Sequence, residues 1–358
     1  MVILGIETSC DETAAAVLTN NNKRITILSN IVASSANLQA KYGGVIPEQA
    51  AREQIKSIIP VIETAINDSR LTISDIDSIA VTYGPGLIGS LLVGVETAKT
   101  LAFLWNKPLI PVNHLMGHFY ANWIENSQTD YRLLTTAISE DGRQKTEDLP
   151  TFPCIGLLIS GGHTDLLLFK NHGQYKYLGG TRDDASGECF DKCARLLGLP
   201  YPGGPAISKL AREGNPSAFD LPRPMIKSDD FEFSFSGLKT AVANLLHTSE
   251  VKKSSYTSEV KCNLAASIEQ AIVDVLVAKT IKAAQTYKVN QIMVAGGVAA
   301  NEKLVSELAT RCKSLAVRLS VPPPELCTDN AAMIAAAAFF NYHPVNPLSL
   351  QADPSLAL

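Results

Sequence analysis

The sequence predicts a two-lobed, internally duplicated α/β protein, because one strand–turn–strand pattern occurs twice. In the first copy the apolar run Val2–Ile6 is followed by the polar turn ETSCDET and a second apolar run, Ala14–Leu18. In the second copy Ile155–Ile159 is followed by the glycine-rich turn SGGHTD and by Leu166–Phe169. Each copy is typical of a buried hairpin with a tight turn. Finding the unit twice, about 150 residues apart, favours duplication.

Helices and strands alternate between and after these hairpins. The isoleucine spacing over Pro47–Asn67 predicts an amphipathic helix. Further expected elements are the strands Ile79–Thr82, Leu109–Val112 and Gln291–Ala295 and helices at Leu91–Leu104, near Asn113, and at Ala265–Thr286, Asn301–Arg311 and Asn330–Phe340. The polar stretch Ser127–Pro150 is interpreted as a lobe connection, and the proline-containing tail His343–Leu358 as poorly ordered.

Composition narrows the class of protein. The 358 residues are 46% hydrophobic and 18% charged, which suits packed cores, and the net charge of −4 means that any nucleic acid must be held by a local basic face. Seven scattered cysteines without a C-x-x-C pair favour a reducing compartment. The start MVILGIE predicts a buried strand rather than a signal peptide, and the longest apolar run, Ala331–Phe340, is too short to span a membrane. We therefore expect a soluble, cytoplasmic protein.

The motif HLMGH offers a metal site. If it is helical, His114 and His118 are four residues apart and lie on one face, where both imidazoles reach one ion. The motif lacks the glutamate of H-E-x-x-H metalloproteases, which disfavours a peptidase. Asp329 in CTDNAAM is a candidate third ligand. The alternatives are two surface histidines and an aspartate that caps the last helix.

Four glycine-rich turns indicate a nucleotide site. Glycines leave backbone N–H groups open to a phosphate or a ribose. The turns are SGGHT (Ser160–Thr164), YPGGP (Tyr201–Pro205), AGGVAAN (Ala295–Asn301) and GPGLIGS (Gly84–Ser90). Neither a P-loop nor a Rossmann glycine pattern is present, so both of those folds are disfavoured.

Two acidic segments are further candidates. In DDASGECFDK, Asp184, Glu188 and Asp191 fall on one face if the segment is helical; they either complement the helix dipole or accept hydrogen bonds from a substrate hydroxyl. The first hairpin turn carries Glu7, Asp11 and Glu12, which would repel one another unless they face an open site, a metal or a group that needs a base. Cys10 between them is interpreted as a buried thiol rather than a nucleophile.

Nine motifs, in this order from Gly5 to Met333, together resemble the tRNA threonylcarbamoyladenosine synthase family of the TsaD (Gcp, "glycoprotease") type. They are GIETSCDET, GPGLIGSLLVG, HLMGH, LISGGHTDL, DDASGECFDK, YPGGP, FSFSGLKTA, VAGGVAAN and CTDNAAM. The resemblance implies an actin-like fold of the sugar-kinase and Hsp70 type, with one lobe over 1–150 completed by a helix at 326–342, a second lobe over 151–325, and a tail at 343–358. It also implies transfer of a threonylcarbamoyl group from threonylcarbamoyl-AMP to the exocyclic amine of the adenosine 3′ to the anticodon, with release of AMP.

The resemblance further implies roles for single residues. Three metal ligands, for iron (Fe²⁺) or zinc (Zn²⁺), match His114, His118 and Asp329. The turn that holds the phosphate and carbamoyl end of the substrate matches Ile159, Ser160, Gly161, Gly162 and His163. The ribose side of the adenylate matches Asp191 and Gly204, and a nucleotide contact matches Asn301. The acids implicated in transfer match Asp11 and Glu12. Ser208 stands where many members carry aspartate, so a ribose contact there is not expected.

The attacking aromatic amine is a poor nucleophile, so the reaction needs a cation at the acyl phosphate and a carboxylate for the amine proton, for which Asp11 or Glu12 is the hypothesis. Family partners are tRNA, a TsaB-like actin-fold protein and a TsaE-like P-loop ATPase, or a second copy in a homodimer. Two alternatives stay open: a small-molecule kinase of the same fold that uses ATP, and a non-catalytic actin-like partner. Such kinases need no imidazole pair.

Overall fold

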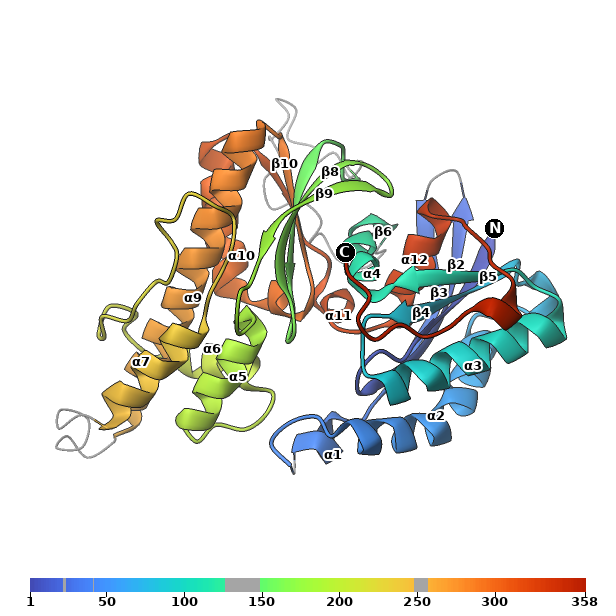
Figure 1. Ribbon diagram of the computed structural model, residues 1–358, viewed down its shortest axis with the longest axis horizontal. Coiled ribbons are helices and arrows are strands. Elements are labelled where there is room, and N and C mark those ends of the chain that lie inside the picture. The colour runs from blue at the N-terminus through green and yellow to red at the C-terminus, as the bar shows by residue number, and fades with distance from the viewer. Residues whose placement is uncertain (22–23, 41, 126–148, 248–256) are drawn as a thin grey trace. The chain divides into compact units, whose positions relative to one another are not determined.

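The computed structural model describes residues 1–21, 24–40, 42–125, 149–247 and 257–358 (Figure 1). The chain divides into two compact units. Unit 1 consists of Met1–Arg132 with Pro322–Leu358, and unit 2 consists of Leu133–Val321. The predicted lobe connection Ser127–Pro150 lies mostly outside the described residues.

The sheets of the two units share one strand order. In unit 1 the order is β5 (Leu109–Asn113), β4 (Ser78–Gly84), β1 (Val2–Glu7), β2 (Glu12–Asn21), β3 (Arg24–Ser34) and β6 (Ile124–Glu125). In unit 2 it is β11 (Arg318–Ser320), β10 (Gln291–Ala295), β7 (Cys154–Ile159), β8 (Thr164–Asn171) and β9 (Gln174–Gly180). In both sheets the first strand pairs antiparallel with the next and parallel with a later strand. Both predicted hairpins are therefore present, and the matched order agrees with the predicted duplication.

Helices cover these sheets. Those of unit 1 are α1 (Ala36–Ala40), α2 (Pro47–Asp68), α3 (Ile88–Trp105), α4 (His114–Tyr120), α11 (Pro324–Cys327) and α12 (Ala331–Phe340). Those of unit 2 are α5 (Ser186–Leu196), α6 (Gly203–Ala211), α7 (Ser236–His247), α9 (Ser258–Tyr287) and α10 (Glu302–Ser314). The predicted helices are found with shifted ends. For example, α9 begins at Ser258 because the Thr257 hydroxyl accepts a hydrogen bond from the Val260 N–H.

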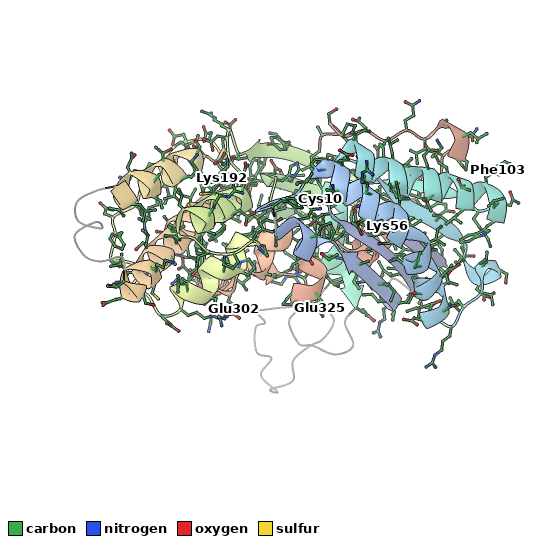
Figure 2. The ribbon with its side chains drawn as sticks, turned by 90° about the horizontal axis from the view of Figure 1, so that it is seen from below. Cys10, Lys56, Phe103, Lys192, Glu302 and Glu325 are labelled. Atoms are coloured by element: carbon green, nitrogen blue, oxygen red, sulfur yellow. The ribbon has the colours of Figure 1, made fainter. Side chains whose placement is uncertain are left out.

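Helix α3 is long and apolar enough to cross a membrane by length and composition alone. It packs instead against β4 and α2, with Leu91, Val95 and Ala98 buried. Its charged residues Glu96 and Lys99 form an ion pair of 2.8 Å. Phe103 projects from its end (Figure 2). Helix α3 is therefore part of the unit 1 fold. One face of the helix packs against the unit, and its other face is exposed.

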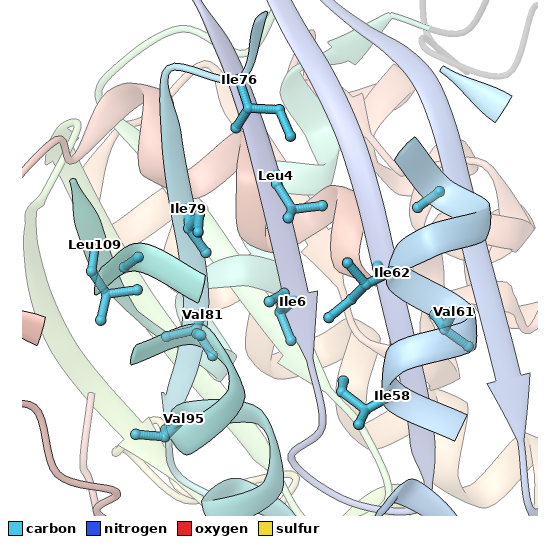
Figure 3. Packing of buried hydrophobic residues seen from close by; sticks show 14 of the residues in the cluster. Leu4, Ile6, Ile58, Val61, Ile62, Ile76, Ile79, Val81, Val95 and Leu109 are labelled. Atoms are coloured by element: carbon cyan, nitrogen blue, oxygen red, sulfur yellow. The ribbon is translucent and has the colours of Figure 1, made fainter. Parts of the chain in front are cut away.

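Strand β1 is buried on both faces. Side chains alternate along a strand, so Leu4 and Ile6 point toward α2, where they meet Ile58 and Ile62 (Figure 3). Gly5 faces the other way, toward α12. A Cβ atom at Gly5 would lie 2.4 Å from the carbonyl oxygen of Ala331. The absence of a side chain at Gly5 therefore lets α12 pack directly on the backbone of the central strand.

The tail after α12, residues 343–358, forms backbone hydrogen bonds with strands β4 and β5. The expectation that it is poorly ordered is therefore wrong. The Val345 N–H donates to the Leu109 carbonyl at 2.9 Å, and the Asp353 N–H donates to the Tyr83 carbonyl at 2.7 Å. Leu350 is buried in the same core. A short proline-rich segment can be held in this way because a strand edge supplies hydrogen-bond partners that the local sequence does not reveal.

We predict that Gly5→Ala lowers the free energy of unfolding by about 1–3 kcal/mol, because the new methyl group overlaps the α12 backbone. Urea-induced unfolding followed by circular dichroism measures the change. Gly237→Ala is the control, because a Cβ there would meet only Pro224 at 3.9 Å. Equal stability of Gly5→Ala and wild type would contradict the close packing of α12 on β1.

Candidate metal centre and substrate-binding turn

The predicted histidine helix is present. The Asn113 side-chain oxygen accepts hydrogen bonds from the Leu115 and Met116 N–H groups, so α4 begins at His114. His114 and His118 then lie on one face, with ring centroids 4.7 Å apart. Both side chains are buried. The alternative of two surface histidines is therefore wrong.

Asp329 lies beside this pair, between α11 and α12. Its Oδ1 atom is 3.3 Å from His118 Nε2 and 3.6 Å from His114 Nε2. The alternative role as helix cap is wrong, because the neighbouring Asn330 caps α12 by accepting from the Met333 N–H at 3.0 Å. One ligand atom from each of His114, His118 and Asp329 lies within 4.8 Å of the others.

These three residues fit a metal ion. His118 is 1% exposed, and neither of its ring nitrogens makes a hydrogen bond among the described residues; Nε2 has only the Asp329 carboxylate nearby, at 3.3 Å. Leaving such a polar ring unsatisfied costs free energy, which a bound cation would remove. Two imidazole nitrogens and one carboxylate oxygen are a common ligand set for iron and zinc.

Glu7 supports the site from behind, a role that the sequence analysis did not assign. Its fully buried carboxylate lies 3.0 Å from His114 Nδ1 and also accepts hydrogen bonds from the Thr82 hydroxyl and the Ser9 N–H. This leaves His114 Nε2 facing Asp329, as in the carboxylate–histidine pairs of metal sites. A signal existed: the parallel strands β1, β4 and β5 end at the same edge of the sheet, which brings Glu7, Thr82 and His114 together.

The charges around the histidine favour a cation. Burial by itself lowers the pKa of His114, but the carboxylates of Glu7 and Asp329 outweigh burial and raise this pKa to about 9. The centre therefore concentrates negative charge in a place that is shielded from water. These carboxylates stabilise a positive charge at the centre, whether it is a proton on His114 or a metal ion.

The acidic turn between β1 and β2 lies near Asp329. Burial, followed by the charges of Asp329 and Asp11, raises the pKa of Glu12 to about 9. Burial and the same acids raise the pKa of the Cys10 thiol far above neutrality. This agrees with the interpretation of Cys10 as a thiol that is not a nucleophile.

The turn Ser160–His163 follows β7 in unit 2. Its backbone is fixed because the Ser160 N–H donates to the His163 carbonyl at 2.9 Å, while the His163 N–H donates to the Ser160 hydroxyl. Ile159 before the turn is fully buried. Gly161 and Gly162 are exposed, and nothing lies within 4 Å of the position that a Cβ atom would take on either. The turn is therefore rigid and open to a ligand.

Two other predicted site residues of unit 2, Asp191 and Asn301, bind the starts of helices, and a third, Gly204, belongs to one of these helices. Asp191 Oδ1 accepts from the Gly203 N–H at 2.7 Å, at the start of α6, next to Gly204. The Asn301 side-chain oxygen caps α10 through the Leu304 N–H. The Asn301 amide donates to Ser208 Oγ at 2.9 Å and to Glu269 Oε1 at 2.8 Å.

Asp184 and Glu188 lie together, since both pair with Lys192 at 2.7 and 2.9 Å, but the expectation that all three carboxylates belong to one helix is wrong. Helix α5 begins at Ser186, with Ala185 as its cap residue, so Asp184 precedes the helix. The preceding residue, Asp183, binds at another helix. Its carboxylate accepts from the N–H groups of Phe235 and Ser236, at the start of α7. The local spacing could not show this, because the acid caps a helix that lies far away in the sequence.

Comparison with known proteins places these features in a family. The family model described as TsaD, tRNA N6-adenosine threonylcarbamoyltransferase, matches residues 26–139 and 135–336. A tRNA N6-adenosine threonylcarbamoyltransferase of Clostridium botulinum (strain Kyoto / Type A2) is 47% identical over 358 residues, covering 99% of this chain and 97% of the relative. A protein of the same name from Staphylococcus haemolyticus (strain JCSC1435) is 46% identical over 341 residues, covering 95% and 91%.

Solved structures show the fold. Component A of the (R)-2-hydroxyglutaryl-CoA dehydratase of Acidaminococcus fermentans matches with a TM-score of 0.50 at 13% identity, covering 94% of this chain and 96% of that one. The activator of the 2-hydroxyisocaproyl-CoA dehydratase from Clostridium difficile, with bound ADPNP, matches with the same score and identity over 95% and 94%. The predicted actin-like fold is thus confirmed. By the family match and the near-full-length relatives, this chain belongs to the tRNA N6-adenosine threonylcarbamoyltransferase family.

Proposed function

We propose that this chain transfers a threonylcarbamoyl group from threonylcarbamoyl-AMP to the exocyclic amine of the adenosine 3′ to the anticodon, in tRNAs that read codons beginning with adenosine. The amine nitrogen bonds to the carbamoyl carbon, the bond from that carbon to the phosphate oxygen breaks, and AMP leaves. The observation that carries the proposal is the buried cluster of His114, His118 and Asp329 in a chain of this family. We propose the cytoplasm as the place of action, where tRNA is modified.

His114, His118 and Asp329 are proposed to hold one divalent metal ion, Fe²⁺ or Zn²⁺. When bound, the ion supplies positive charge that offsets the acyl phosphate of the donor. Glu7 fixes the ring of His114 in the orientation that a metal ligand needs. Side chains and backbone groups of the protein are proposed to bind the substrate and to accept the amine proton.

The substrate is proposed to bind through the turn Ile159, Ser160, Gly161, Gly162 and His163, whose open glycines allow close approach of the phosphate and carbamoyl end. Asp191 and Gly204 are proposed to contact the ribose side of the adenylate. Asn301 is proposed to contact the nucleotide, using the second lone pair of its side-chain oxygen or its backbone, since both amide hydrogens already have acceptors.

The amine proton is proposed to pass to Asp11 or Glu12. Both belong to the acidic turn near Asp329, and Asp11 is 8% exposed. Burial and the neighbouring acids raise the pKa of Glu12, so Asp11 is the acid to test first.

A small-molecule kinase of the same fold is the second candidate, because the open glycine turn of unit 2 would suit ATP equally well. The metal cluster favours the transferase, since a kinase receives Mg²⁺ together with its nucleotide and has no use for buried imidazoles. A non-catalytic actin-like partner would likewise not need two buried histidines that converge on an aspartate. A peptidase is disfavoured further, because Leu115 stands where H-E-x-x-H enzymes carry glutamate.

Partner proteins are proposed as in the family. A TsaB-like actin-fold protein, or a second copy of this chain in a homodimer, would cover exposed apolar side chains on α2 and α3. The exposed fractions are 65% for Ile55, 48% for Ile59, 68% for Phe103 and 67% for Leu104. A TsaE-like P-loop ATPase is the further partner. The net charge of −4 leaves tRNA binding to a local basic face or to these partners.

We predict that His118→Ala loses the bound metal and that His114→Ala does the same, because each removes one of three ligands. Elemental analysis of purified protein gives the stoichiometry and identifies the metal as iron or zinc. His172→Ala, remote from the cluster in sequence, should retain the metal. Full transfer activity in a metal-free variant would remove the metal from the proposed reaction.

We predict that Asp11→Asn reduces single-turnover transfer from preformed threonylcarbamoyl-AMP to unmodified tRNA by about 100-fold or more, the scale of a lost general base. Metal content should stay at the wild-type level, because Asp11 is not a ligand. Glu12→Gln should be measured beside it. A near-wild-type rate for Asp11→Asn would leave the proton to Glu12 or to another group.

We predict that the double change Ile55→Asp with Ile59→Asp prevents complex formation with the TsaB-like protein, because charged groups replace apolar ones on one exposed face of α2. Size-exclusion chromatography of the mixed proteins measures this. Ile73→Asp is the matched control, being 42% exposed on another element. If the complex with the TsaB-like protein is unchanged, the partner binds another surface. If the substitutions instead dissociate a homodimer, this face of α2 binds a second copy of the chain.

A further inference from the structure

The acidic turn that links β1 to β2 is held through its backbone. It contains Thr8, Ser9, Cys10, Asp11 and the first residue of β2, Glu12. The carbonyl oxygens of Thr8, Cys10 and Glu12, at alternate positions, all accept hydrogen bonds from one group. That group is the side-chain amide nitrogen of Gln54, at 3.4, 3.1 and 2.8 Å.

Gln54 lies on α2 and is 1% exposed. Its orientation is fixed, because a flipped amide would place an oxygen against three carbonyl oxygens. Its own Oε1 atom is buried and has no hydrogen-bond partner among the described residues. A buried acceptor without a partner is unfavourable, because it has lost its hydrogen bonds to water. Gln54 therefore binds the turn through its Nε2 donor, while its Oε1 acceptor makes no hydrogen bond among the described residues.

Residues of other elements each bind a single carbonyl of the turn. The Leu87 N–H donates to the Ser9 carbonyl at 2.8 Å, and Ser90 Oγ donates to the Cys10 carbonyl at 2.8 Å. The N–H and hydroxyl of Ser35 both donate to the Asp11 carbonyl. Gln54 differs from these because it joins both residues that flank Asp11, so it fixes the direction in which the chain presents this carboxylate.

We infer that Gln54 is a positioning residue for the transfer reaction, which holds the carboxyl groups of Asp11 and Glu12 in place by binding the carbonyls of Thr8, Cys10 and Glu12. The inference rests on the proposed function, in which these acids receive the amine proton. Proton transfer depends on heavy-atom distances of about 2.6–3.2 Å. A shift of the turn by about 1 Å can cost 100-fold in rate without unfolding the protein.

The test compares Gln54→Met, which keeps the length of the side chain and removes its donor, with Ser29→Ala. Ser29 is a matched control, because its hydroxyl makes another buried hydrogen bond to α2, to the Ala65 carbonyl at 2.6 Å. We expect single-turnover transfer to fall about tenfold or more in Gln54→Met, with unchanged metal content and unchanged KM for tRNA. Ser29→Ala should keep the wild-type rate while its unfolding midpoint shifts by a comparable amount.

Two further measurements separate positioning from general weakening. Combined with Asp11→Asn, Gln54→Met should lower the rate little further, because both changes act on one group. Amide hydrogen exchange of a peptide covering residues 8–12 should become faster in Gln54→Met and stay unchanged in Ser29→Ala. If Gln54→Met does not fold, Gln54→Asn, one methylene shorter with the same amide, takes its place.

The outcomes are distinct. A wild-type rate and wild-type exchange in Gln54→Met, with Asp11→Asn impaired, would overturn the inference and leave the proposed function intact. A normal rate in Asp11→Asn would instead count against the proposed role of the acids. Equal rate losses in Gln54→Met and Ser29→Ala would show only a structural role for Gln54 and would also overturn the inference.

Discussion

The buried charge of Glu7 is the constraint on which the unit 1 site depends. A carboxylate without exposure to water must be compensated by hydrogen bonds or by positive charge. Here the compensation comes from β4 through Thr82, from the turn through the Ser9 N–H, and from α4 through His114. Since each donor belongs to a different element, satisfying Glu7 fixes the end of β1, the end of β4 and the start of α4 relative to one another. The ring of His114 is oriented as a consequence.

Duplication supplies one framework for two kinds of chemistry. The turn after β1 and the turn after β7 occupy the same place in two sheets of matching order. In unit 1 this turn carries the acids Asp11 and Glu12, which suit a cation or a proton in transit. In unit 2 the equivalent turn carries Gly161 and Gly162, with open backbone that suits an anion. The sheets can be alike because the specific chemistry lies in the turns.

Helix α2 connects the unit 1 core, the acidic turn and the protein surface. Ile58 and Ile62 pack on β1, Gln54 binds the backbone of the turn, and Ile55 and Ile59 are exposed. A helix has room for these separate contacts because residues three or four positions apart share a face while adjacent ones diverge. A shift of α2 would therefore displace both the acidic turn and the exposed side chains of Ile55 and Ile59.

Features that depend on near neighbours in the chain could be predicted from the amino-acid sequence alone. Both hairpins, the strand Gln291–Ala295 and the pairing of His114 with His118 follow from periodicity and spacing, which act within a few residues. Other contacts became visible in the folded chain alone. Asp329 reaches the histidines while Asn330 caps the helix, and Glu7 contacts His114. Gln54 binds the acidic turn, and Asp183 caps α7. The tail after α12 also pairs with the first sheet. These contacts join residues far apart in the chain, so they depend on strand order and helix packing, which no local pattern encodes.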